Sequence, residues 1–433
     1  MIESVAAGGD GVGHLPDGRV VFVPLTAPGD RVRVRIEEDR ARFARGSLDT
    51  LISEGPSRCE PRCPVFGSCG GCAWQHIRYE DQLEAKRRIL VDALARIGGF
   101  ELSEAPVIHP SPQPYHYRAR TRVLVRGGLV GYRRRRSHRL CAIESCPVLA
   151  PPVDDLLSRI AEAPESWVPS GAQSVGDKSR VALNEQPEEE WELCAGSGGE
   201  ARSWRIPKDP QVACDESAQP RARSHAPDAD ISQREGPAVT IALTAGSLQI
   251  SPGVFMQANA LLWQDLVDAV VAQAVSGAGG ARGSLIELFA GAGFFTLSLA
   301  SYFSRVVAVE SDARAVVDLA ANIEAAGLAH VEVVAEPVDT ALCRQWDAPD
   351  CVVLDPPRTG LSRDAVRRLA ELDAPRIVYL SCDPATLARD LRLLCEERPA
   401  YRLTHTSAFD LFPQTPHVEG LAVLEQPYRH APA

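Results

Sequence analysis

The chain has 433 residues, a length that allows about two to four domains. Hydrophobic residues make up 45% of it and charged residues 24%, and this ordinary globular composition excludes collagen-like, coiled-coil and wholly disordered chains. No apolar run approaches the roughly eighteen residues of a membrane span, and the N-terminus lacks the basic start and apolar core of a signal peptide. We therefore expect a soluble, cytoplasmic protein without a membrane partner.

The formal net charge of −11 would argue against a nucleic-acid partner if the charge were evenly spread, but it is not. Residues 151–237 carry 17 acidic and 9 basic residues, whereas residues 115–140 hold nine arginines and no acidic residue. A local basic stripe is what phosphate binding requires, whatever the total charge. The alternative is an arginine-rich face that is only solvated.

Residues 1–55 alternate apolar and polar side chains between turn residues, which predicts short strands at Arg19–Val23, Arg31–Glu37 and Phe43–Ile52. Such strands suit a small β-barrel of the oligonucleotide-binding type, although any small all-β module would show the same pattern. We expect residues 1–55 to form the first domain.

Cysteines gather in the segment that follows. Because a cytosol keeps thiols reduced, twelve cysteines without a signal peptide indicate metal binding rather than disulfides. Four of them could bind one metal, since three share a short loop and the fourth follows the arginine-rich segment: Cys63, Cys69, Cys72 and Cys146. Four thiolates suit zinc or an iron–sulfur cluster, and the CxxC core alone leans to zinc. Cys59 and Cys141 remain alternative ligands.

Residues 56–245 are expected to form a central domain that is rich in strands. A helix is predicted over residues 78–97, and we expect it to pack on the C-terminal domain. Its apolar face is predicted to consist of Leu83, Leu90, Leu94 and Ile97. From about 160 to 237 the chain is rich in Ser, Pro, Glu and Gly, which indicates a surface insertion or a poorly ordered loop.

Residues 246–433 alternate short apolar runs with helical stretches, which predicts a parallel sheet with helices on both faces. The predicted strands are Ser284–Leu288, Arg305–Glu310, Val331–Val334, Cys351–Asp355 and Arg376–Ser381. The predicted helices are Phe294–Tyr302, Ala313–Ala326, Arg363–Glu371 and Ala385–Glu396. Ligands of such sheets bind beyond the carboxyl ends of the strands.

The first of these strands ends in the glycine-containing turn LFAGAG, residues 288–293. Glycines allow the backbone to turn sharply and to approach a ligand closely. Glu310 ends the next strand, where a carboxylate can accept hydrogen bonds from ribose hydroxyls. Because Thr296 stands where a dinucleotide site has its third glycine, the pattern favours S-adenosylmethionine over NAD.

Two further motifs stand at carboxyl ends of strands. Cys382 precedes a predicted helix, whose positive N-terminal dipole favours a thiolate, so we predict a nucleophile there; the alternative is a buried apolar cysteine. Asp355-Pro356-Pro357-Arg358 is a stiff loop that holds its two charged residues at the ligand edge, and it resembles the motif by which many nucleic-acid methyltransferases hold a planar base. The alternative is a turn with no further role.

Taken together, these motifs resemble those of the RNA uracil-5-methyltransferases that act on 23S ribosomal RNA, over nearly the whole chain. The opening segment GVGHLPDGRVVFVPLTAPGDRVRVRI is similar to the TRAM domain of that family, and CPVFGSCGGC with the distant CPVL is similar to its iron–sulfur site. FMQAN, LFAGAGFFTL and LDPPR continue the match, and SCDPATLARD and HVEG are its most specific pieces.

The resemblance implies a class I, Rossmann-like methyltransferase domain that uses S-adenosylmethionine to methylate carbon 5 of uracil in RNA. Cys382 would add to carbon 6 of the base, and Glu419 would accept the carbon-5 proton. The implied cofactor-binding residues are Gln257, Phe289, Gly291, Glu310 and Asp355. The resemblance also implies a [4Fe–4S] cluster rather than zinc at Cys63, Cys69, Cys72 and Cys146. We expect the cluster to be structural and the protein to be a monomer.

The chain also departs from the family pattern. Residues 150–245 align poorly with its central domain, Phe294 replaces a polar residue, and Glu336-Pro337 replaces an Asn or Asp, which leaves the adenine contact unassigned. Two alternative functions therefore stay open. One is a methyltransferase acting on tRNA or on another acceptor, such as cytosine or protein; absence of a covalent adduct with 5-fluorouracil RNA would favour an acceptor other than uracil. The other is a non-catalytic iron–sulfur protein that binds RNA.

Overall fold

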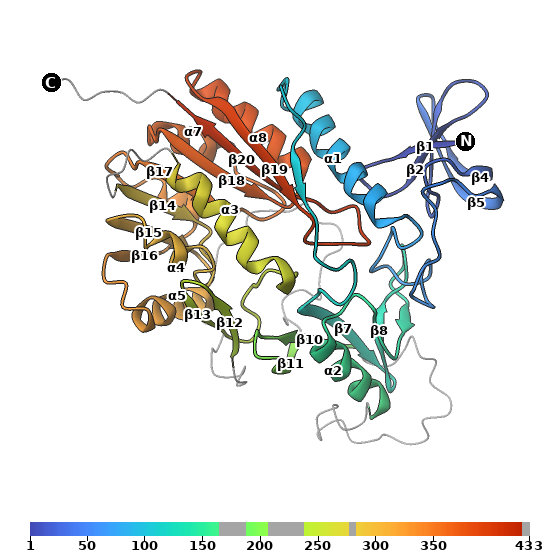
Figure 1. The fold of residues 1–433 in the computed structure, drawn as a ribbon, viewed down its shortest axis with the longest axis horizontal. Coiled ribbons are helices and arrows are strands. Elements are labelled where there is room, and N and C mark those ends of the chain that lie inside the picture. The colour runs from blue at the N-terminus through green and yellow to red at the C-terminus, as the bar shows by residue number, and fades with distance from the viewer. Residues whose placement is uncertain (164–187, 207–237, 277–282, 427–433) are drawn as a thin grey trace, which may run out of the picture.

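The computed structural model describes residues 1–163, 188–206, 238–276 and 283–426. Figure 1 shows a small N-terminal sheet (blue), a central sheet (teal and green) and a large C-terminal sheet flanked by helices (yellow to red). None of the helices in these described ranges is long and apolar enough to cross a bilayer.

The N-terminal sheet has the strand order β1-β2-β3-β5-β4. Its strands are β1 (Ile2–Val5), β2 (Gly11–His14), β3 (Val20–Val23), β4 (Arg31–Asp39) and β5 (Phe43–Ser53). Three of them match the predicted strands within two residues. β1 and β2 were missed because they span only four residues each and β2 contains two glycines. The sheet closes on a small core of Ile2, Val21, Val23 and Ala44.

The central sheet has the order β11-β10-β7-β8-β9. Its strands are β7 (Arg120–Arg126), β8 (Leu129–Arg133), β9 (Leu140–Ala142), β10 (Glu188–Ala195) and β11 (Ala201–Ile206), and helix α2 (Pro151–Glu162) packs on it. β10 and β11 fall inside the predicted insertion, so that interpretation is wrong for residues 188–206. The rest of the segment, 164–187 and 207–237, lies outside the described residues.

The acidic composition of β10 concealed its place in the sheet. Glu192 pairs with Arg120 (2.6 Å) and Arg122 (3.1 Å) on β7, and Glu188 pairs with Arg126 and with Arg133 (2.8 Å). Carboxylates that look solvated in the sequence are therefore neutralised by the arginine-rich strands beside them.

The C-terminal sheet has the order β16-β15-β14-β17-β18-β20-β19-β6. Its strands are β6 (Val107–His109), β14 (Ser284–Leu288), β15 (Arg305–Glu310), β16 (Val331–Ala335), β17 (Cys351–Leu354), β18 (Arg376–Ser381), β19 (Arg402–Phe409) and β20 (Glu419–Glu425). The strands from β16 to β18 are parallel, and β20 runs antiparallel to both neighbours. Predicted strands Ser284–Leu288, Arg305–Glu310 and Arg376–Ser381 match residue for residue.

Helices cover both faces of this sheet, as predicted (Figure 1). They are α3 (Trp263–Val275), α4 (Thr296–Leu299), α5 (Ala313–Ala325), α6 (Val338–Ala341), α7 (Arg363–Glu371) and α8 (Pro384–Glu397); the hairpin β12 (Val239–Leu243) and β13 (Gly246–Ile250) packs beside α5. α4 is shorter than the predicted 294–302 because the glycine-containing turn continues as far as Phe295.

Helix α1 (Tyr79–Arg96) packs against α8, where Leu90 and Leu94 share a core with Leu387 and Leu391. The predicted apolar face was partly wrong, since Ile97 is 40% exposed. The buried face instead consists of Gln82, Lys86, Ile89, Leu90, Ala93 and Leu94. Two polar side chains thus enter the core from this helix.

Candidate active site

The carboxyl ends of β14, β15 and β17 form one edge of the C-terminal sheet. Glu310 ends β15, and its carboxylate accepts the backbone N–H groups of Gly291 (2.8 Å), Ser311 (2.6 Å) and Asp312 (2.7 Å). Gly291 (φ +58°) and Phe289 (φ +64°) both adopt the left-handed backbone conformation, which is strained for a phenylalanine. Such strain clusters at ligand sites, and Glu310 fixes the turn that carries it.

Gln257 and Asp355 meet at the same edge. The Gln257 side-chain amide donates to Asp355 Oδ2 (3.1 Å), and the Gln257 carbonyl accepts from the Trp263 indole (2.9 Å). Burial raises the pKa of Asp355 to about 7, although the Gln257 hydrogen bond acts in the opposite direction. The structure therefore brings together the five predicted cofactor residues on neighbouring strand ends and loops.

Glu287 was not singled out in the sequence. It is the acidic residue in the otherwise apolar strand β14, it is 2% exposed, and neither carboxylate oxygen has a hydrogen-bond partner within the described residues. Burial raises the pKa of Glu287 to about 8, and the carboxylates of Asp355 and Glu310 add to the rise against the Thr296 hydroxyl. A lone carboxylate in an apolar central strand was the available signal.

The pairing of β18 with β20 brings Cys382 to Glu419. Ser381 ends β18 and pairs with Gly420, so the next residues in the register are Cys382 and Glu419. Glu419 is 3% exposed, and its Oε1 has no hydrogen-bond partner in the part of the chain that the structure describes. Burial raises the pKa of Glu419 well above its ordinary value, Asp355 adds to this, and Arg358 opposes it.

The predicted effect of the helix dipole on Cys382 is wrong for this arrangement. Burial raises the pKa of the Cys382 thiol to about 11, the Glu419 carboxylate raises it further, and Arg358 opposes both. Helix α8 does begin just after Cys382, but its N-cap Asp383 accepts the Thr386 N–H (2.9 Å). Burial and the Glu419 carboxylate therefore outweigh the effect of the helix end that the sequence had suggested.

Arg358 lowers the pKa values of both Cys382 and Glu419, and His417 helps to hold its guanidinium in place. The Arg358 guanidinium donates to the His417 ring (3.3 Å), and its backbone carbonyl accepts from the Thr386 hydroxyl (3.0 Å). Burial, followed by Arg358, lowers the pKa of His417 to about 4, so the ring is neutral and can accept this hydrogen bond.

A cavity of about 610 Å³ opens at Cys382. Arg358, His417 and the first turn of α8 line it on one side, while α1 and the end of β1 line the other. The N-terminal sheet thus reaches the mouth of the candidate active site, and the space is of the size that a nucleotide with its neighbours needs.

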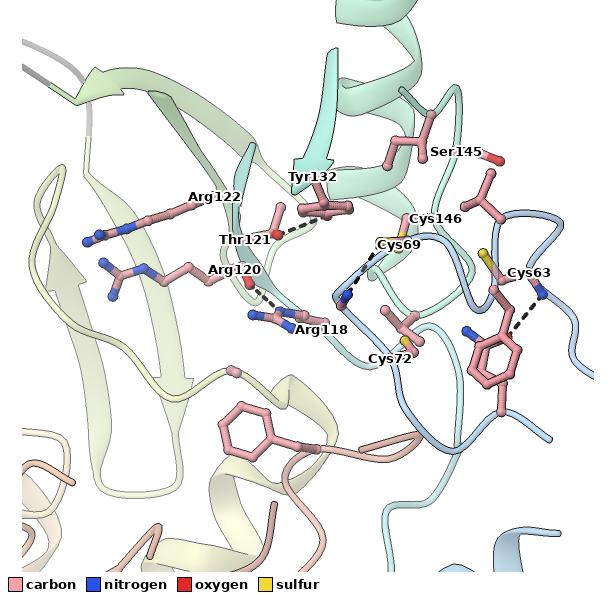
Figure 2. Close-up of a pocket in the computed structure, with 18 of the residues that line it drawn as sticks. Cys63, Cys69, Cys72, Arg118, Arg120, Thr121, Arg122, Tyr132, Ser145 and Cys146 are labelled. Carbon is pink, nitrogen blue, oxygen red and sulfur yellow. Dashed lines mark hydrogen bonds between the residues drawn. The ribbon is translucent and has the colours of Figure 1, made fainter. Parts of the chain in front are cut away.

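The four predicted metal-binding cysteines line a second cavity, of about 430 Å³ (Figure 2). Cys59 and Cys141 do not line it: the Cys59 thiol donates to the Gln75 carbonyl (3.4 Å), and Cys141 is buried in β9. Within the described residues, no group of three or more His, Cys, Asp or Glu side chains is close enough together to hold a metal ion.

The chemistry of this cavity suits a cationic group. Burial raises the pKa of Cys69 to about 11 and that of Cys72 to about 12, so thiolates here need a positive charge between them. Backbone N–H groups also fix the loop ends: that of Gly71 donates to Cys69 Sγ (3.4 Å), and that of Cys146 donates to Asp154 (2.6 Å). Figure 2 shows Arg118 beside the same space.

Fewer arginines of residues 115–140 are free to bind phosphate than the sequence indicates, because several form ion pairs within the protein. Besides the four arginines that pair with β10, Arg135 (3.2 Å) and Arg136 (3.1 Å) both pair with Asp10 of the N-terminal sheet. The departures noted above have plain structural roles: Glu336 pairs with Arg344 (2.6 Å), and the Phe294 ring packs edge-on against Phe295. The residue that would contact adenine stays unassigned.

Comparison with known proteins gives one consistent result. Residues 246–427 match the family described as tRNA (Uracil-5-)-methyltransferase, and residues 1–48 match the TRAM domain. The 23S rRNA (uracil(1939)-C(5))-methyltransferase of Halomonas elongata is 34% identical over 99% of this chain and 89% of its own. An RNA methyltransferase of Thermosynechococcus vestitus is 32% identical over 98% and 96%.

Among solved structures, the Pyrococcus abyssi tRNA (uracil-54, C5)-methyltransferase in complex with S-adenosyl-L-homocysteine superimposes with a TM-score of 0.71 at 26% identity, covering 98% of this chain and 99% of that one. The match therefore extends over the methyltransferase sheet and the smaller N-terminal parts together. The chain belongs to the family of S-adenosylmethionine-dependent RNA (uracil-5-)methyltransferases that carry a TRAM domain.

Proposed function

We propose that this enzyme methylates a uracil of 23S ribosomal RNA through a covalent bond between Cys382 and carbon 6 of the base, with Glu419 as the base that completes the reaction. The observation that carries the proposal is the register of β18 and β20, which sets the buried Glu419 carboxylate beside Cys382, a thiol that lines the cavity.

The chemistry follows from the residue types. Carbon 5 of uracil is a weak nucleophile, and addition of the Cys382 thiolate to carbon 6 shifts the electron pair of the double bond toward carbon 5 and the carbonyl. S-adenosylmethionine supplies the methyl group when it is bound. Once carbon 5 is methylated, the Glu419 carboxylate removes the carbon-5 proton, the double bond re-forms, and the Cys382 sulfur leaves as thiolate.

Surrounding residues would support these steps. Arg358 opposes the raised pKa values of both Cys382 and Glu419, so it favours the two anions that the reaction needs. Gln257, Phe289, Gly291, Glu310 and Asp355 would hold S-adenosylmethionine along the strand ends. The target base must leave any helical stack to reach Cys382, at a cost of roughly a few kcal/mol. Contacts of the RNA with the N-terminal sheet and α1 would offset that cost.

The choice of ribosomal RNA rests on the relatives. The chain is more similar to relatives named as 23S rRNA enzymes than to the solved tRNA enzyme. Transfer RNA is the second candidate, because the tRNA enzyme matches along nearly its whole length.

We also propose that Cys63, Cys69, Cys72 and Cys146 hold a [4Fe–4S] cluster. Four thiols from two separate segments line one cavity, and the resemblance of CPVFGSCGGC and CPVL to the iron–sulfur site of the family supports a cluster over zinc. Its positive iron atoms would stabilise thiolates that burial otherwise disfavours. The methylation needs no electron, so the cluster would act in holding this region together.

The test is transfer of a labelled methyl group from S-adenosylmethionine to unmodified 23S rRNA and tRNA, with anaerobically purified protein. Label at uracil carbon 5 in 23S rRNA, formed by the wild type and absent with Cys382→Ala, is the expected result. Cys382→Ala should still bind S-adenosylmethionine, which calorimetry can verify. Label in tRNA alone would overturn the assigned substrate, and turnover by Cys382→Ala would overturn the assigned nucleophile.

The role of Glu419 has a separate readout. Glu419→Gln should carry out addition and methyl transfer but stall before elimination, so a methylated protein–RNA adduct should accumulate on denaturing gels. Normal turnover by this variant would assign the base elsewhere.

A further inference from the structure

The connection between β19 and β20, residues 410–418, leads directly into Glu419, and elements outside the C-terminal sheet hold it. Figure 1 shows this red segment reaching from the sheet toward α1. Its first residue, Asp410, follows Phe409, and Phe409 is the register partner of Glu419 on β19. Whatever fixes Asp410 therefore acts one residue away from the strand position opposite the proposed base.

Lys86 fixes Asp410 from helix α1. Both side chains are fully buried, and the Lys86 ammonium contacts the Asp410 carboxylate and donates to the Phe412 carbonyl (3.0 Å). The Trp74 ring lies 6.0 Å from the ammonium, and burial lowers the pKa of Lys86 against the opposing effect of Asp410. Burying a charge pair costs desolvation free energy, and an apolar pair of similar size often gives equal stability. Stability alone therefore does not explain why this loop is held by charges.

A second anchor lies one helical turn earlier. Gln82 and Gln414 exchange hydrogen bonds: the Gln82 amide donates to Gln414 Oε1 (3.0 Å), and the Gln414 backbone N–H donates to Gln82 Oε1 (2.9 Å). Gln414 has a left-handed backbone (φ +69°), a conformation that its surroundings must enforce. The Tyr117 hydroxyl donates to the carbonyl of the preceding residue, Pro413 (2.9 Å).

From these contacts we propose that Lys86, with Gln82 as its second anchor, is a positioning residue for Glu419, acting through the Asp410–Val418 connection. The inference rests on the proposed role of Glu419 as base. Its chemical content is that α1, an element outside the catalytic sheet, sets the distance between the Glu419 carboxylate and the carbon-5 proton. A displacement of about 1 Å at such a group can lower the rate about 100-fold.

A structural role alone and a positioning role predict different behaviour. Lys86→Met keeps most of the side-chain length but removes the cation that neutralises the buried Asp410 carboxylate, so it destabilises the protein in either case. If Lys86 positions Glu419, elimination fails selectively: kcat falls about 100-fold, KM for RNA stays within about threefold, and the methylated covalent adduct accumulates as it does in Glu419→Gln. Gln82→Met should show the same adduct to a smaller extent, and it serves if Lys86→Met does not fold.

The matched control removes another buried cation, Arg376, which lies at the start of β18. Arg376 pairs with Glu425 at the far end of β20, away from Glu419. Arg376→Met should lower the melting temperature but leave kcat unchanged and accumulate no adduct at a temperature where it is folded.

A double variant separates the effect of Lys86 on protein stability from its effect on the position of Glu419. Lys86→Met combined with Asp410→Asn removes the unpaired charge, so stability should recover while the adduct persists. Recovery of turnover together with stability would overturn the inference, as would a Lys86→Met variant that behaves like Arg376→Met. If Glu419→Gln turns over normally, Glu419 is not the base, and the positioning role of Lys86 fails with it. If Glu419→Gln traps the adduct but neither Lys86→Met nor Gln82→Met does, only the positioning role fails.

Discussion

Cys382 stands opposite Glu419 across the antiparallel pair β18–β20, one step beyond the Ser381–Gly420 register partners. The pairing puts a thiol and a carboxylate side by side, and both burial and the Glu419 carboxylate raise the pKa of the Cys382 thiol. The protein as it stands therefore holds Cys382 as a thiol at neutral pH. Activity should therefore increase as the pH rises and the thiolate fraction of Cys382 grows.

We expect kcat/KM for RNA to rise with pH. The Cys382 thiol has a pKa of about 11, so the thiolate fraction of the free enzyme increases about tenfold per pH unit throughout the neutral range. Steady-state rates between about pH 6.5 and 8.5 should give a logarithmic slope near 1. A profile that is flat or falls above pH 7 would contradict this assignment of the thiol's protonation state.

Arg358 should hold that thiol pKa below what burial alone would produce. Because the guanidinium opposes both burial and Glu419, Arg358→Met should shift the alkylation profile of Cys382 by about one pH unit toward alkaline, equivalent to about 1.4 kcal/mol. Iodoacetamide labelling of the Cys382 peptide, followed by mass spectrometry across pH, measures this directly. Arg392→Met is the control, because Arg392 lies on the exposed side of α8 and pairs with Glu396. An unshifted profile in Arg358→Met would remove the arginine from the activation of the thiol.

Much of the fold was predictable because its signals are local. β14, β15 and β18 are short apolar runs bounded by turn residues, and each pattern lies within about six residues. β10 was not predictable, because its glutamates gain partners from strands far away in the chain; Arg120 and Arg122 of β7, for example, lie about seventy residues before Glu192. The same holds for Lys86, whose charge looks solvated on a helix until Asp410 arrives from 324 residues away.

The candidate site shows the same division. Cys382, Glu419 and the four cysteines proposed as cluster ligands could be named from motifs. The thiol pKa could not, because it depends on burial and on a carboxylate brought in by strand pairing. Glu287 was missed for a related reason. Its burial within the central strand β14, close to Asp355 and Glu310, is a property of three-dimensional packing.

Glu287 should destabilise the protein at alkaline pH and support cofactor binding. Its folded pKa of about 8 exceeds the unfolded value of 4.5, so the folded state binds the proton more tightly and loses stability as pH rises through this window, by at most about 1.4 kcal/mol per unit. Glu287→Gln should therefore melt near the wild-type temperature at pH 5 and above it at pH 8.5.

The same variant should bind S-adenosylmethionine about tenfold more weakly, because a buried carboxylate that forms no ion pair within the described residues suits the cationic part of that ligand. A lost pairing of about 1.4 kcal/mol corresponds to this factor. Calorimetry in buffers of different ionisation enthalpy should also show proton release on binding to the wild type and none with Glu287→Gln. Equal proton release by both proteins would place the ligand's charge elsewhere.

The metal assignment predicts which cysteines matter. Cys63→Ser, Cys69→Ser, Cys72→Ser and Cys146→Ser should each lower the iron and sulfide content of anaerobically purified protein from about four of each per chain and bleach its brown colour. Cys59→Ser is the matched control, since Cys59 lies in the same segment but does not line the cavity.

The bleached variants should also melt at a lower temperature, because the Cys69 loop donates backbone hydrogen bonds to Arg133 and Gln414 and so ties the central sheet to the connection before Glu419. A colourless wild type with about one zinc per chain would replace the cluster with a zinc site, and iron loss in Cys59→Ser alone would move the ligand set.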